Sequence, residues 1–155
     1  MAPETIIALD AMGGDNAPAM VVRGADIAVE RMPDLIFKIV GDEKVLEPLI
    51  GESKYLQSSN CSVIHTDKKV EDSEKPSVAL RSGKDSSMRL AIDLVANQEA
   101  HGVVSAGNTG ALMVMSKLGL RMCPGIDRPA IASFFPTLKG ESCMLQFRLP
   151  TVTLA

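Results

Sequence analysis

The chain has 155 residues, of which 46% are hydrophobic, and its formal net charge at pH 7 is −3. This length suits one ordinary domain, which can bury a core without disulfide bonds or a structural metal. The slightly acidic balance argues against a nucleic-acid partner, since such surfaces usually carry a basic stripe, but it is compatible with a local pocket for one small anion.

Other sequence signals exclude further classes. No run approaches the roughly 18 consecutive apolar residues of a membrane span, and the N-terminus lacks the plan of a signal peptide. Cys61, Cys123 and Cys143 are far apart and odd in number, which is typical of reduced thiols in a cytoplasmic protein. No CxxC or HExxH spacing occurs, so neither a metal ion nor another cofactor is expected.

Strand and helix patterns alternate along the chain. In chain order the predicted elements are strand Thr5–Asp10, helix Ala17–Arg31, strand Leu35–Val40, helix Asp42–Ile50, strand Ser62–His65, a helical turn Val78–Ser82, helix Ser87–Glu99, strand Val103–Val104, helix Thr109–Leu120, and strands Ala130–Phe135 and Ser142–Leu145. The segment Thr66–Ser77 is charged and predicts a loop. Because Thr109–Leu120 is apolar almost all round, we expect that helix to be deeply buried.

Helices of about ten residues between strands indicate β-α-β units, an α/β fold class and a mainly parallel sheet, which predicts a three-layer α/β/α arrangement. Ligands of such sheets bind outside the carboxyl ends of the strands. The turns from strand to helix are therefore the candidate site, and we expect them to lie at one end of the sheet.

The first turn contains Asp10, Gly13, Gly14 and Asp15. Paired glycines allow a left-handed or closely approaching backbone, and the two flanking acids could orient a polar ligand or a lysine. A tight turn in which Asp15 caps the next helix explains the same residues equally well.

The turn after the fourth strand runs from Ser105 to Gly110 and includes Gly107, Asn108 and Thr109. Its glycines bring free N–H groups together at a helix N-terminus, which is suited to an anion, with the hydroxyls of Ser105 and Thr109 beside them. The alternative is that Asn108 or Thr109 only caps the helix, and the two roles are compatible.

A third cluster precedes the helix that starts at Ser87. Arg81, Lys84, Ser86 and Ser87 combine cations, hydroxyls and a helix N-terminus, a set that suits a phosphate oxyanion. A solvated loop in which Ser86 or Ser87 caps the helix is the simpler interpretation. Three candidate anion sites at the turns of one sheet are more persuasive together than any one alone.

These segments resemble the bacterial phosphate acyltransferases known as the PlsX family. The opening signature of that family is similar to Ala8–Asp15, and its central signature is similar to Ser105–Met113. Two shorter blocks match Ala79–Met88 and Gly125–Ala130. The similarity keeps its order from residue 5 to about residue 145.

The resemblance implies an enzyme that makes acyl phosphate from acyl-[acyl carrier protein] and inorganic phosphate, in the first step toward glycerol 3-phosphate acylation. It implies a Rossmann-like α/β/α sandwich, a homodimer, a membrane glycerol 3-phosphate acyltransferase as the next enzyme, and a cytoplasmic location that is peripheral at the membrane in the full-length form. It assigns Lys84 and Asn108 to catalysis. The expected phosphate-binding residues are Asp10, Gly13, Gly14, Asp15, Ser86, Ser87, Ser105, Gly107, Thr109 and Gly110.

The match divides the chain into residues 1–145, the N-terminal part of a phosphate acyltransferase domain, and residues 146–155, a tail outside the family pattern of the kind that a frameshift produces. Three hypotheses remain open: an acyl-phosphate-forming enzyme, a phosphate-binding domain without turnover, and a non-functional remnant. We expect the isolated chain to be aggregation-prone and to show little or no synthesis of acyl phosphate.

Overall fold

The computed structural model describes residues 4–127 and 129–146. The chain forms two compact units, Met1–Leu120 and Arg121–Ala155. Arg128, which belongs to one of the blocks of family resemblance, and residues 147–155 of the predicted tail lie outside the described residues.

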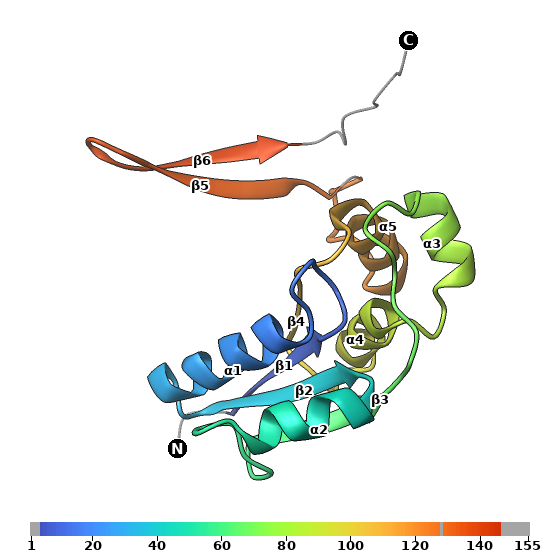
Figure 1. The fold of residues 1–155 in the computed structure, drawn as a ribbon. Coiled ribbons are helices and arrows are strands. Elements are labelled where there is room, and N and C mark those ends of the chain that lie inside the picture. The colour runs from blue at the N-terminus through green and yellow to red at the C-terminus, as the bar shows by residue number, and fades with distance from the viewer. Residues whose placement is uncertain (1–3, 128, 147–155) are drawn as a thin grey trace. The chain divides into compact units, whose positions relative to one another are not determined.

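The first unit contains a four-stranded parallel sheet in the order β3-β2-β1-β4 (Figure 1). Its strands are β1 (Thr5–Asp10), β2 (Leu35–Gly41), β3 (Cys61–His65) and β4 (Gly102–Ser105). The chain moves outward from β1 through β2 to β3 and then returns to the other side of β1. This reversal lies between β1 and β4, the place where sheets of this kind bind ligands. The predicted α/β class and parallel sheet are confirmed.

In the described part of the chain, five helices accompany the sheet: α1 (Ala19–Arg31), α2 (Glu43–Gly51), α3 (Pro76–Ser82), α4 (Ser87–Ala96) and α5 (Thr109–Gly119). Alternation along the strands separates the two apolar layers. On one face Leu9 and Phe37 pack with buried residues of α1 and α2. On the other face Ala8 and Val40 pack with Ala91 and Leu94 of α4. The sheet therefore has helices on both faces, which agrees with a Rossmann-like sandwich.

Helix α5 differs from the prediction of deep burial. Only Ala111 and Met115 are buried, and Leu118 is 62% exposed. Among the described residues, the helix packs mainly on α3 and α4. The apolar sequence of α5 shows how much surface the helix could bury, but the described residues cover only part of that surface.

The second unit contains an antiparallel hairpin of β5 (Ile131–Thr137) and β6 (Gly140–Gln146). Both strands were predicted, but they do not continue the parallel sheet, because a turn of two residues joins them directly without a crossover helix. Gly140 adopts a φ of +135° in this turn, a conformation that glycine tolerates. Phe134 and Met144 are 71% and 60% exposed on opposite faces of the hairpin.

Candidate functional site at the carboxyl ends of β1 and β4

Asp10 lies at the centre of the candidate site. It ends β1, is only 1% exposed, and pairs in register with Ser105 at the end of β4. Its Oδ1 accepts a hydrogen bond of 2.5 Å from the Ser87 hydroxyl, and its Oδ2 accepts one of 2.6 Å from the Ser105 hydroxyl. One buried carboxylate thereby joins the end of β1, the end of β4 and the start of α4.

The first and fourth turns touch through their glycines. A Cβ atom added at Gly13 would lie 2.6 Å from Asp10 Oδ2 and 3.0 Å from both Cα and N of Gly107. Gly14 has a φ of +100°, and a Cβ atom there would lie 2.9 Å from the Ala106 carbonyl oxygen. Two backbones can approach this closely only without side chains between them. The prediction that Gly13 and Gly107 lie at the same end of the sheet is confirmed.

The N-terminus of α5 opens onto a polar cleft of about 470 Å³. Asn108 is the N-cap, and its Oδ1 accepts a hydrogen bond of 3.0 Å from the Ala111 N–H. Within the described part of the chain, the N–H groups of Asn108, Thr109 and Gly110 have no hydrogen-bond acceptor. The residues that line the cleft are Gly14, Asp15, Asp72, Ala106, Gly107, Asn108, Thr109 and Gly110. Six of these residues, all except Asp72 and Ala106, are predicted site residues.

The third cluster is divided between the interior and the surface. Ser86 is the N-cap of α4, where its hydroxyl donates to the Gly83 carbonyl at 2.7 Å and accepts from the Arg89 N–H at 3.3 Å. Ser87 is also buried, and its hydroxyl donates to Asp10. Lys84 is exposed and forms no hydrogen bond or ion pair with any described residue. None of the three lines the polar cleft.

The side chain of Asn108 has a second structural contact. Its amide nitrogen donates to the carbonyl oxygens of Asp72 at 2.9 Å and Glu74 at 2.8 Å, so it fixes the loop before α3 against the start of α5. This contact brings Asp72 into the cleft. Nothing in the local sequence indicates that approach, because the residues are 36 positions apart and the loop resembles an ordinary charged connection.

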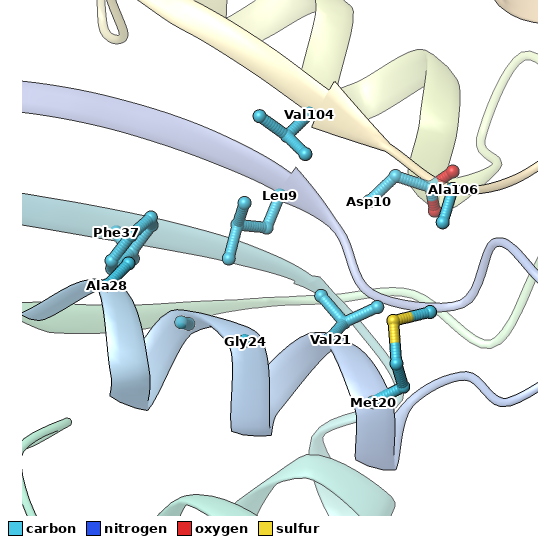
Figure 2. Close-up of a pocket in the computed structure, with 10 residues that line it drawn as sticks. Leu9, Asp10, Met20, Val21, Gly24, Ala28, Phe37, Val104 and Ala106 are labelled. Carbon is cyan, nitrogen blue, oxygen red and sulfur yellow. The ribbon is translucent and has the colours of Figure 1, made fainter. Parts of the chain in front are cut away.

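A separate apolar groove of about 250 Å³ lies between α1 and one face of β1 and β4 (Figure 2). Val104, on the edge strand, is 56% exposed, and Met20, at the start of α1, is 44% exposed. Ala106 lines both this groove and the polar cleft. The lining of the groove is almost entirely apolar, and sequence analysis did not predict it.

The two histidines have structural contacts of their own. His101 accepts a hydrogen bond from the Ile6 N–H at 3.0 Å, and His65 accepts one from the Glu43 N–H at 3.2 Å. Among the described residues, no group of three or more His, Cys, Asp or Glu side chains is arranged to hold a metal ion. None of the helices described is both long and apolar enough to cross a lipid bilayer.

The fold and the glycine-lined turns define an α/β protein with a candidate ligand site at the carboxyl ends of its strands. The sequence profile of the family described as "Fatty acid synthesis protein" matches residues 5–147. The chain belongs to this family, as the resemblance of its motifs indicated.

Individual relatives agree with this assignment. The chain is 60% identical over 145 residues to the phosphate acyltransferase of Rhodospirillum centenum, an alignment that covers 94% of this chain and 41% of the relative. It is 52% identical over 145 residues to the phosphate acyltransferase of Rhodospirillum rubrum, with the same coverage. The enzyme of that name from Vibrio parahaemolyticus is 45% identical over 135 residues, which are 87% of this chain and 40% of the relative. The chain thus spans about two fifths of the length of these relatives.

Proposed function

We propose that this chain contributes the phosphate-binding half of a site that transfers an acyl group from a thioester of acyl carrier protein to inorganic phosphate. The single observation that carries the proposal is the set of free N–H groups of Asn108, Thr109 and Gly110 at the start of α5, beside a polar cleft. Such an array offers donors and the positive end of a helix dipole to an oxyanion. The names of the relatives supply the chemical class.

The chemistry asks little of the protein beyond position and charge. A phosphate oxygen attacks the thioester carbonyl carbon and forms the new acyl–oxygen bond, which gives a tetrahedral oxyanion. The oxyanion then collapses: the carbonyl re-forms, the carbon–sulfur bond breaks, and the thiolate of the carrier leaves and takes up a proton. Binding phosphate in a fixed orientation makes the attack effectively intramolecular, and N–H donors stabilise developing negative charge. We assign phosphate positioning to the 105–110 turn, and we assign Lys84 to charge compensation.

Phosphate binding is tested on the chain itself. Titration of the ¹⁵N-labelled chain with inorganic phosphate should shift the amide resonances of Asn108, Thr109 and Gly110 in a saturable way, and chloride at equal ionic strength should not. Gly107→Val should abolish the response, because a side chain there would lie 3.1 Å from Gly13 Cα and 3.2 Å from Met88 Cε. Equal shifts with chloride, or an unaltered response in Gly107→Val, would contradict the assignment.

Acyl transfer is tested separately. We expect residues 1–145 joined to the C-terminal remainder of the Rhodospirillum centenum enzyme to release free carrier protein from acyl-[acyl carrier protein] in a phosphate-dependent reaction. The 155-residue chain alone should release little or none. A phosphate response without release by the joined protein would favour phosphate binding without turnover. The homodimer, the peripheral membrane location and the membrane acyltransferase partner remain predictions.

A further inference from the structure

The observation that carries a further inference is the chain of hydrogen bonds from Asp10 to the 105–110 turn. Asp10 Oδ2 accepts from the Ser105 hydroxyl at 2.6 Å, and the Ser105 oxygen in turn accepts from the Gly107 N–H at 3.1 Å. Asp10 is 1% exposed and does not line the polar cleft. It therefore connects to the free N–H groups of the turn only through other residues.

We propose that Asp10 is a positioning residue, which orients the 105–110 turn for an oxyanion without touching that ion. The proposal rests on the proposed function, because it takes phosphate as the ligand of the turn. It gives Asp10 a different role from the phosphate-binding role that the sequence predicts.

The direction of each hydrogen bond follows from the chemistry of a carboxylate, which can only accept. Ser105 has to donate its proton to Asp10, so a lone pair of its oxygen remains for the Gly107 N–H. That bond turns the Gly107 N–H inward. The next three N–H groups, of Asn108, Thr109 and Gly110, are left without internal acceptors in the described structure. Asp10 thus holds the Gly107 N–H inward through Ser105, next to the three N–H groups that remain available.

Asp10→Asn is the informative substitution because it keeps the shape and changes one acceptor into a donor. On the Oδ1 side two donors converge, the Ser87 hydroxyl at 2.5 Å and the Met12 N–H at 3.4 Å. On the Oδ2 side there is one side-chain donor, Ser105. The new amide NH₂ therefore faces Ser105, whose oxygen must then accept from it. The Ser105 hydroxyl then loses the carboxylate acceptor that fixes its orientation, and its oxygen is shared between the amide and the Gly107 N–H, so the hydrogen bond to Gly107 weakens and the substitution acts on the connection to the turn.

Asp26→Asn is a matched control. Asp26 on α1 also fixes a loop, through hydrogen bonds of 2.7 Å and 2.9 Å that its Oδ1 accepts from the Tyr55 and Leu56 N–H groups. Desolvation raises its pKa, but the hydrogen bonds from these N–H groups outweigh that effect and lower the pKa overall. Asp26 lines neither the polar cleft nor the apolar groove. Its substitution should weaken its own loop without any effect on the 105–110 turn.

The experiment has two readouts on the ¹⁵N-labelled 155-residue chain. Without ligand, Asp10→Asn should reduce the hydrogen-exchange protection of the Gly107 amide by about tenfold, as expected when a hydrogen bond tied to a charged group is lost. With inorganic phosphate as the probe, it should weaken the affinity by about tenfold on the same grounds. Asp26→Asn should leave both quantities within about twofold, the error expected for independent sites.

Each outcome decides a different question. Unchanged Gly107 protection in Asp10→Asn would overturn the positioning role, whatever the chain binds. Reduced protection with unchanged phosphate affinity would also overturn the positioning role, because phosphate binding by the 105–110 turn would then not depend on Asp10. Reduced protection in a chain whose wild type binds no phosphate would support the control of the turn by Asp10 and refute the proposed function. A uniform loss of protection across α4, α5 and the sheet would identify Asp10 as a merely structural residue.

Discussion

The close contact between the first and fourth turns leads to a sharp prediction for Gly13→Ala. The added Cβ atom would lie 2.6 Å from a buried carboxylate oxygen and 3.0 Å from two backbone atoms of Gly107. Ordinary van der Waals contact requires considerably more than this, and neither neighbour is the free end of a flexible side chain. The carboxylate is held by two serine hydroxyls, and Gly107 is held by Ser105. We therefore expect a loss of about 1–3 kcal/mol in the free energy of unfolding, the usual range for overpacking.

The assay is urea unfolding at low micromolar concentration, followed by circular dichroism, with Gly24→Ala as the matched control. Gly24 lies in the middle of α1, and a Cβ atom there would meet nothing within 4 Å. The same substitution should therefore stabilise the chain by up to about 1 kcal/mol, because alanine has the higher helix propensity. If Gly13→Ala unfolded at the same urea concentration as the wild type, the two turns would not approach as described.

Two further predictions concern the surface of the first unit and its half-buried thiol. The double variant Met20→Glu and Val104→Thr should shift the chain toward monomer in sedimentation velocity, because both side chains are exposed in the apolar groove. The control Val45→Glu changes a residue on α2 that is 43% exposed, and it should leave the association unchanged. Equal behaviour of the two variants would mean that the groove does not drive association. Burial raises the pKa of Cys61 to about 11, so at pH 8 its reaction with iodoacetamide should be slower than that of the exposed Cys123 and Cys143. The contribution of the neutral Cys61 thiol to the free energy of unfolding should be complete below pH 9 and lost as the pH rises from 9 to about 11. Equal alkylation rates for the three thiols would contradict the raised pKa.

The elements of the first unit could be predicted because their sequence patterns are local. Each strand is a short apolar run that ends in a glycine or a polar residue, and the observed bounds differ from the predicted ones by only a few residues. The helix predicted from Ala17 begins at Ala19, and Pro18 is its N-cap. Asn108 caps α5 and Ser86 caps α4, which were among the alternatives that the sequence left open.

The contacts that make the site could not be predicted because they join distant positions. Ser87 meets Asp10 across 77 residues, and Ser105 meets it across 95. In the sequence, Ser87 is one more hydroxyl beside a lysine, which suggested a ligand-binding role. The fold instead directs this hydroxyl inward onto a carboxylate. The prediction that α5 is deeply buried is wrong for a related reason: an apolar pattern does not specify which other parts of the chain pack against the helix.

The charges around the polar cleft show how much positive charge a bound phosphate would still need. Its lining contains the carboxylates of Asp15 and Asp72 and no lysine or arginine among the residues described. The start of α5 offers about half a positive charge, which falls short of compensating a phosphate dianion beside two acids. Under the proposed function, the remaining charge has to come from a cation outside the described lining of the cleft. Lys84 precedes α4, whose first residue donates to Asp10, and it has no acidic partner in the described structure. The nearby Lys68 differs, because its hydrogen bond and ion pair with Asp85 raise its pKa and occupy its charge. Lys84 is therefore the stronger candidate of the two lysines for balancing the charge of a bound phosphate.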